Sequence, residues 1–149
     1  MATIKLEQQA AQSLTVTGLS TLAAGNYAAS AEIVNSNDPI DVLIEVTAAT
    51  TNTIGGGLQV LVFAKGSLDG TNFGSGPESS SSTTDEPDLH YLGSLPLRSA
   101  STDHRKIFSL ASAFGGVLPA KSKLVFKNDL NVALTSGSVK TAEIIGVSV

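Results

Sequence analysis

The stretch LQVLVFAK, residues 58–65, decides the fold. Successive residues of an extended strand point to opposite faces. One face of this stretch is apolar throughout and consists of Leu58, Val60, Val62 and Ala64. The other face carries Leu61 and Phe63 between Gln59 and Lys65, so it is largely apolar as well. A strand with two apolar faces is typical of a position inside a sheet that is covered on both sides. We therefore predict that residues 58–65 form a central strand.

Similar short strand patterns recur on both sides of this stretch, separated by turn residues such as glycine, asparagine and proline. The predicted strands are Leu14–Thr17, Ala28–Val34, Ile40–Thr47, Tyr91–Leu97, Lys106–Leu110, Leu124–Lys127, Val132–Leu134 and Val139–Val149. Pro96 favours an edge position for its strand, or the end of the strand. Ser109–Phe114 could form a single helical turn. This number and spacing of strands predict an all-β fold, an antiparallel β-sandwich and in particular a jelly roll.

The predicted core takes one face from each of the stronger strands. Its members are Val42, Ile44, Val46, Leu58, Val60, Val62, Phe108, Val125, Phe126 and Ile144.

The chain of 149 residues suits one domain. Residues 14–149 are predicted to form the sandwich, and residues 1–13 a short polar arm that becomes ordered on a partner. The Ser-rich segment 74–88 is predicted to be an exposed, mobile loop, because its composition offers nothing to bury. The first residues lack the apolar core of a signal peptide, and no apolar run is long enough for a membrane span.

Composition excludes several classes of function. Charged residues make up 15% of the chain and the net charge is −4, without a cluster of Lys and Arg. Nucleic acid is therefore not expected as a direct partner, because binding to phosphates requires a basic surface. The chain has no cysteine, which removes disulfides, thiolate metal sites and cysteine nucleophiles. We expect no cofactor.

Residues that could support catalysis or metal binding are few. The two histidines, His90 and His104, lie in or beside loops, and the sequence lacks the Gly-x-Ser-x-Gly elbow of serine hydrolases. The acidic string 85–88 could offer carboxylates to calcium, although a solvated loop is the favoured interpretation. The glycines at 55–57 lack the Lys-Ser/Thr of a phosphate-binding loop. We predict that the protein is not an enzyme and has no catalytic, cofactor or metal residues.

The string SLDGTNF, residues 67–73, predicts a turn with a defined mechanism. Asp and Asn side chains can bond their own nearby backbone, and glycine supplies a positive φ. Similar strings occur in discoidin-type sandwich domains that bind glycans or membranes. A host-surface glycan-binding module is therefore one alternative function, with Asp69, Asn72 and Phe73 as the residues to test. The chain has no tryptophan, the usual stacking residue of such sites.

Several strings taken together resemble the small structural proteins of tailed bacteriophage particles. They are LAAGNYAASAEIVNSNDPIDVLIEVTA at 22–48, VLVFAKGSLDGTNF at 60–73 and FSLASAFGGVL at 108–118, followed by Pro119 and the strand at 124–128. Their order along the chain is also similar, and the resemblance covers most of the sequence after about residue 14.

The resemblance implies a jelly roll of the capsid decoration, or cement, type, located in the virion and assembled in the host cytoplasm. The partners it implies are the major capsid protein or other virion proteins. A tail or head–tail connector subunit is the alternative within this class. We expect a homo-oligomer, and a trimer in particular because icosahedral shells offer three-fold sites.

Overall fold

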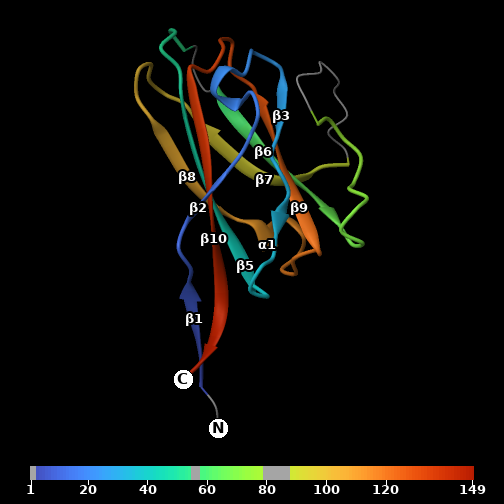
Figure 1. Ribbon diagram of the computed structural model, residues 1–149. Helices are drawn as coiled ribbons and strands as arrows, with labels where there is room; N and C mark the ends of the chain where they lie inside the picture. The colour runs from blue at the N-terminus through green and yellow to red at the C-terminus, as the bar shows by residue number, and fades with distance from the viewer. Residues whose placement is uncertain (1–2, 55–57, 79–87) are drawn as a thin grey trace.

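The computed structural model describes residues 3–54, 58–78 and 88–149. Two antiparallel five-stranded sheets pack face to face as a sandwich (Figure 1). This confirms the predicted all-β class. Within the described residues the helical elements are a short 3-10 turn, η1 (Leu19–Thr21), and a one-turn helix, α1 (Leu110–Ala113).

The first sheet contains β1 (Ile4–Gln8), β2 (Gln12–Leu14), β5 (Asp41–Ala49), β8 (His104–Ser109) and β10 (Ser136–Ser148). Its order is β1-β10-β5-β8, and β2 also pairs with β10. The second sheet contains β3 (Tyr27–Ala29), β4 (Ile33–Val34), β6 (Gln59–Ser67), β7 (His90–Pro96) and β9 (Lys121–Asn128). Its order is β3-β9-β6-β7, and β4 also pairs with β9.

Strand β6 lies between β9 and β7 and is covered on both faces, as its pattern predicted. The face with Val60 and Val62 points into the main core between the sheets. On the opposite face Phe63 joins a smaller cluster with Tyr27, Leu89 and Val125. Strand β7, which ends at Pro96, is the outer strand of this sheet, so the edge position favoured by that proline is confirmed.

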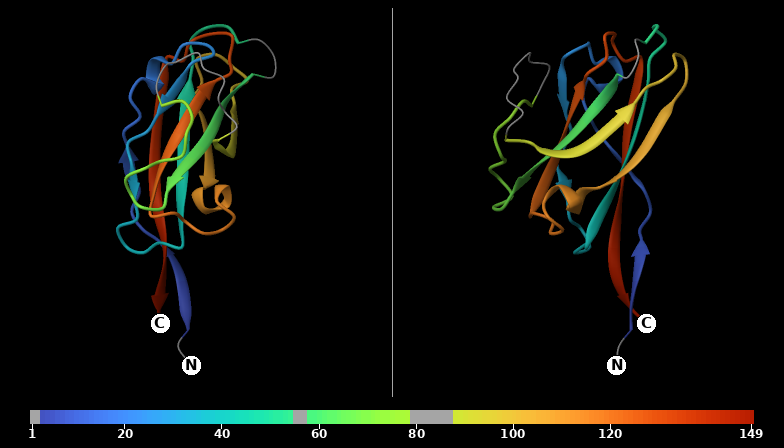
Figure 2. Two further views of the ribbon diagram at one scale, coloured as in Figure 1. Left: turned by 90° about the vertical axis from the view of Figure 1, so that its right-hand side faces the viewer. Right: turned by 180° about the vertical axis from the view of Figure 1, so that it is seen from behind.

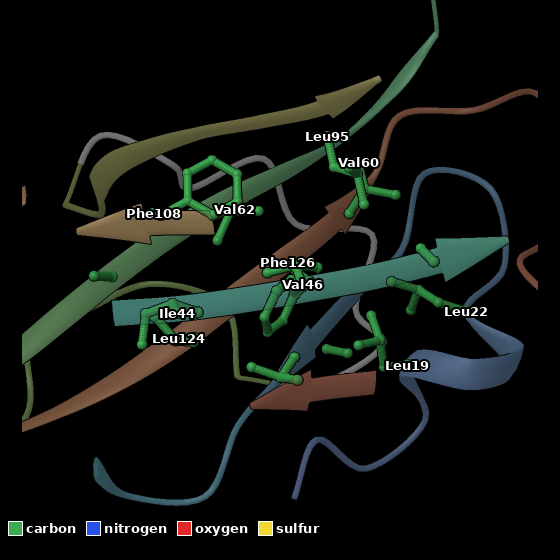
Figure 3. Close-up of a cluster of buried hydrophobic side chains, with 14 of the residues drawn as sticks. Leu19, Leu22, Ile44, Val46, Val60, Val62, Leu95, Phe108, Leu124 and Phe126 are labelled. Atoms are coloured by element: carbon green, nitrogen blue, oxygen red, sulfur yellow. The ribbon is translucent and has the colours of Figure 1, made fainter. Parts of the chain in front are cut away.

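Most of the predicted core is buried between the two sheets (Figure 3). The members buried there are Val42, Ile44, Val46, Val60, Val62, Phe108 and Phe126. Val125 is also buried, but in the smaller cluster on the opposite face of the second sheet. Leu58 is partly buried and packs against this core. The prediction for Ile144 is wrong, because this residue is half-buried on the other face of the first sheet. In the register of β10 with β5, Val139 pairs with the core residue Val46, which places Val139 inward and Ile144 outward.

The predicted strand at 132–134 is also wrong, because loop contacts hold this segment instead. Asn128, which is fully buried, donates hydrogen bonds from Nδ2 to the carbonyl oxygens of Leu22 (2.8 Å) and Val132 (2.9 Å). Its Oδ1 accepts from the N–H of Leu130 at 3.0 Å. The N–H of Leu134 donates to the carbonyl of Leu22 at 3.0 Å. The hydrogen bonds of the buried Asn128 side chain thus hold this segment as a loop.

The helical turn expected at Ser109–Phe114 is present as α1, and Asp41 holds its start. The Ser109 hydroxyl donates to Oδ2 of Asp41 at 2.6 Å, and the N–H of Ala111 donates to Oδ1 at 2.9 Å. These bonds satisfy donors that a helix leaves unpaired at its first turn.

The N-terminal segment differs from the arm that the sequence suggested. Residues 4–8 form β1, which pairs along the last residues of β10 and projects with them beyond the sandwich (Figure 2). The segment is ordered because the chain's own C-terminal strand supplies its backbone partner.

The predicted exposed loop, 74–88, is described in part. Glu78 is exposed, but Pro77 is buried. Residues 79–87 lie outside the described part of the chain.

Candidate functional site

The feature that stands out as a binding surface is the ribbon formed by β1 and the end of β10, from the pair Gln8–Ile144 to the pair Ile4–Ser148. We call it the β1–β10 ribbon. Its ladder continues at both ends, because the N–H of Gln9 donates to the carbonyl of Glu143 (2.8 Å) and the N–H of Val149 to that of Thr3 (2.9 Å). All residues of β1 are exposed. A two-stranded ribbon alone is marginally stable in water, so further contacts would strengthen it.

The ribbon carries apolar side chains on a face that continues along the first sheet. Residues opposite each other in an antiparallel pair share a face, so Leu6 and Ile144 lie on the outer side of this sheet, with Leu43 and Ile107 further along it. Ile4 and Leu6 are 70% and 61% exposed, and Ile107 is 58% exposed. We call the stripe of Ile4, Leu6, Leu43, Ile107, Ala142 and Ile144 the outer apolar stripe.

The stripe contains a shallow hollow between oppositely charged side chains. Gln8, Leu43, Ile107 and Ala142 line it, and Glu45 and Lys140 stand beside them. Arg105 lies near Glu45, with 3.7 Å between Nε and Oε1. An apolar patch with a polar rim is typical of a surface that binds another protein.

A second apolar hollow lies at the end of the sandwich where β6 ends and α1 begins. It is lined by Leu68, His90, Ala113, Phe114, Gly115, Val117, Leu118 and Pro119. Leu68 and Val117 are 92% and 75% exposed. Two of the strings that carry the phage resemblance meet here. Gly66 allows their close packing, because a Cβ at that position would lie 2.8 Å from Cγ of Pro119.

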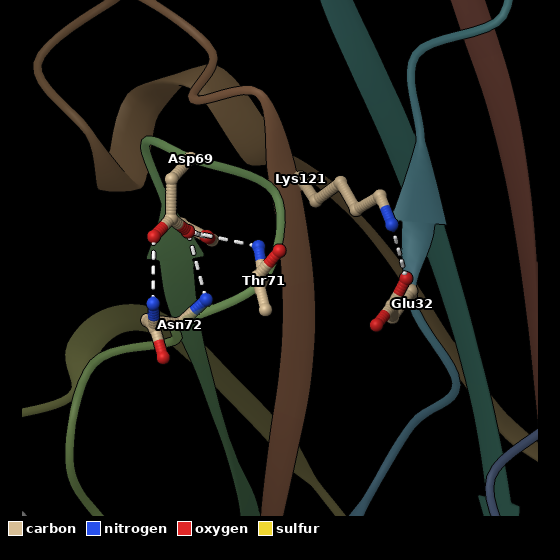
Figure 4. Close-up of polar contacts among 6 residues, drawn as sticks. Glu32, Asp69, Thr71, Asn72 and Lys121 are labelled. Atoms are coloured by element: carbon tan, nitrogen blue, oxygen red, sulfur yellow. Dashed lines mark hydrogen bonds and ion pairs between the residues drawn. The ribbon is translucent and has the colours of Figure 1, made fainter.

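The turn predicted at 67–73 forms as expected, with Asp69 at its centre (Figure 4). Oδ1 of Asp69 accepts from the N–H groups of Thr71 and Asn72, both at 2.8 Å, and from the Ser67 hydroxyl at 2.9 Å. The Asn72 amide donates to Oδ2 at 2.7 Å. These bonds, led by that from the N–H of Asn72, hold the pKa of Asp69 well below its usual range.

The residues named for glycan binding are therefore engaged in this turn. Asp69 and Asn72 bond each other, and Phe73 lies under Nζ of Lys123, 4.5 Å from its ring centroid. Beside the turn, Nζ of Lys121 donates to Oε2 of Glu32 at 2.8 Å, which ties β9 to the segment before β4 (Figure 4). This hydrogen bond lowers the pKa of Glu32.

The structure places the two histidines in separate settings. His90 is exposed and packs against Phe114 with the two rings tilted, 4.9 Å between the ring centroids. Nε2 of His104 accepts from the N–H of Arg98 at 3.1 Å, and its buried Nδ1 has no hydrogen-bond partner among the described residues.

Other site predictions fall wholly or partly outside the described residues. The glycines at 55–57 do so, as do positions 85–87 of the acidic string, whose last member, Asp88, is exposed. Within residues 3–54, 58–78 and 88–149, no group of three or more metal-ligating side chains is gathered to hold an ion. No helix in that part of the chain has the length and apolarity to cross a membrane.

The fold and surface define the chain as an antiparallel β-sandwich with a projecting ribbon and an outer apolar stripe in which Ile4, Leu6 and Ile107 are exposed. No protein-family model matches the chain, and no curated protein matches it.

The ribbon was not predicted from the sequence, because the N-terminal residues were judged by their overall polarity. The signal was the alternation of Ile4 and Leu6 with Lys5 and Glu7, which is a strand pattern. The other strand of the ribbon, β10, was predicted from the sequence as the final strand.

Proposed function

We propose that this chain is a virion structural subunit of a tailed bacteriophage, a capsid decoration protein that binds the major capsid protein. The observation that carries the proposal is the β1–β10 ribbon, which extends beyond the sandwich with Ile4 and Leu6 exposed. Such an extension contributes nothing to the sandwich core and offers apolar surface to a neighbour. The sequence resemblance to small phage structural proteins indicates that this neighbour is another protein of the virion.

The weak charge of the chain supports the same role. Charged residues are only 15% of the sequence. Burying ions at an interface costs desolvation free energy that neutral side chains do not incur. A surface of this kind therefore suits a permanent contact in a particle.

We also propose that the sandwich is a jelly roll. Taking β1 with β2 and β3 with β4 as single strands, the first strand pairs with the last and the second with the next to last. Further inward, β5 pairs with β8 and β6 with β7. This nested order is what two Greek keys wrapped into one sandwich require.

The proposal is tested with particles assembled without this protein, to which the purified chain is added before sedimentation. We expect the wild-type chain to sediment with the particles and Leu6→Asp to stay in the supernatant, because a carboxylate on the ribbon end of the stripe opposes burial. Ser99→Asp is the matched control, since Ser99 is exposed near the opposite end of the sandwich.

Cryo-electron microscopy of the natural particle then locates the chain. Density at many regular capsid positions supports decoration. A few copies along the tail or at one vertex would instead make the chain a tail or connector subunit. Absence from the particle, with no sedimentation of the wild-type chain, would overturn the proposal.

A further inference from the structure

We propose that a second copy of this chain pairs with the outer edge of β1, antiparallel and across a two-fold axis at Leu6. Strand β1 is the outermost strand of its sheet, and none of the described strands pairs with its other side. The inference rests on that edge alone and does not depend on the proposed phage role.

The backbone of β1 shows which groups the edge offers. The carbonyl group of Thr3 and the N–H group of Gln9 point toward β10, where each forms a hydrogen bond. In an antiparallel ladder this direction alternates along the strand, so Lys5 and Glu7 also face β10. Ile4, Leu6 and Gln8 consequently direct both backbone groups away from β10, toward the free edge. A row of unpaired donors and acceptors is a template for another strand.

Antiparallel pairing centred on Leu6 satisfies this row completely. Leu6 then faces Leu6 of the second copy, and Ile4 faces Gln8 of the second copy on each side of the axis. All three are hydrogen-bonded pairs, in which each residue exchanges both of its backbone bonds with the residue opposite. No outward-facing group of Ile4, Leu6 or Gln8 is left without a partner.

The charges of β1 select this register over its neighbours. Centring on Leu6 places Lys5 opposite Glu7 of the second copy, and the symmetry repeats the ion pair. Moving the axis to Lys5 would bring the two lysines face to face, and moving it to Glu7 would do the same for the two glutamates. Opposite charges directly across a strand pair stabilise it and like charges destabilise it. Within the described residues neither Lys5 nor Glu7 has an ion pair in the single chain.

The pairing also joins the outer apolar stripes of the two copies, because Leu6 lies on that face in each. Antiparallel self-pairing of one edge is closed after two copies, so it favours a dimer over the trimer expected from the sequence. The paired edge is short compared with the interface of a permanent dimer, so we expect dimerisation to depend on concentration.

Sedimentation velocity of the purified chain over a range of concentrations tests the pairing. We expect a monomer–dimer equilibrium for the wild-type chain. Lys5→Glu places carboxylates opposite each other at both symmetry-related positions, and Glu7→Lys does the same with ammonium groups. Each variant should weaken the dimer by roughly tenfold or more. Far-UV circular dichroism checks that both remain folded.

Two combinations of these substitutions distinguish the effect of the proposed pairing register from a general effect of charge on dimerisation. Lys5→Glu combined with Glu7→Lys in one chain restores both ion pairs and should restore the dimer. An equimolar mixture of the two single variants should form a heterodimer, because each chain supplies the charges that the other lacks. Wild-type chain that stays monomeric or forms trimers, or a dimer that ignores these substitutions, would overturn the proposal.

Two separate proline substitutions in β1 test which backbone N–H groups face the free edge and which face β10. Leu6→Pro removes an N–H that faces the free edge, so the chain's own ladder with β10 is preserved while the dimer is lost. Lys5→Pro removes an N–H that bonds β10 and should also lower the thermal stability of the monomer. Equal thermal stability for both variants would contradict the assignment of the edge.

Discussion

Nζ of Lys65, on a side chain that is only 1% exposed, lies 2.5 Å from Oε1 of Glu78, whose side chain is 55% exposed. Lys123 approaches the same oxygen at 3.9 Å. A buried ammonium group is costly unless an opposite charge and hydrogen bonds compensate it. Glu78 therefore stabilises a charge inside β6 and ties the segment after the 67–73 turn to the sheet. The bond to Lys65 lowers the pKa of Glu78.

Glu78→Gln should lower the free energy of unfolding by about 1–3 kcal/mol, because Lys65 loses its charged acceptor while remaining buried. Lys65→Met in the Glu78→Gln background should recover most of that loss, since the methionine fills similar space without a charge. Urea denaturation of the variants and the wild-type chain measures both effects. If the double variant is as unstable as Glu78→Gln alone, the buried ammonium is not the cause.

Acid should weaken the 67–73 turn through Asp69. Its pKa in the folded chain is depressed below the ordinary value of 3.8, so its contribution to stability is present above that value. The contribution is lost as the pH falls through the folded pKa, because the unfolded chain then binds the proton more readily. The melting temperature of Asp69→Asn should lie below that of the wild-type chain at neutral pH, and the gap should narrow below about pH 4.

Asp103→Asn serves as the control for this measurement, because Asp103 is exposed and lies outside the 67–73 turn. A gap between wild type and Asp69→Asn that stays constant from neutral to acid pH would contradict the role given to the ionised carboxylate.

Gly93 in β7 should tolerate no side chain, because a Cβ there would lie 2.6 Å from Cε1 of Phe108. We expect Gly93→Ala to lower the free energy of unfolding by about 1–3 kcal/mol. Gly74→Ala is the matched control, since its Cβ would meet ordinary contacts at 3.9 Å. Adding Phe108→Leu to Gly93→Ala should make the alanine less costly than it is beside Phe108. Calorimetry of the wild-type chain, Gly93→Ala, Phe108→Leu and the double variant tests this coupling.

Asn128→Asp should destabilise the chain strongly, by about 2–5 kcal/mol, because a buried carboxylate would face the carbonyl oxygens of Leu22 and Val132 that now accept hydrogen bonds. Asn131→Asp is the control on an exposed position of the same loop. Equal midpoints for the two variants in urea denaturation would show that the Asn128 amide does not organise this segment.

The parts of the fold that the sequence predicted well depend on short-range patterns. The alternation in residues 58–65 placed β6 in the middle of a sheet, and the Asp, Gly and Asn of residues 67–73 predicted their turn. The helical turn at α1 was found in the same way, although its contact with Asp41 was not. The candidate surface was predicted less well, because an exposed strand such as β1, which contributes nothing to the core, resembles an irregular arm until its partner is known.

By itself, then, the sequence determined the all-β class, the turns and which residues of β5 and β6 share a face, because these follow from the two-residue period of a strand and from bonds between near neighbours. The tertiary structure alone decided that Val139 and not Ile144 faces the core, that Lys65 is buried and that Asn128 joins distant loops. Asn128 and Leu22 are 106 residues apart in the chain. A contact across that separation depends on how the sheets stack, and local residue patterns do not predict it.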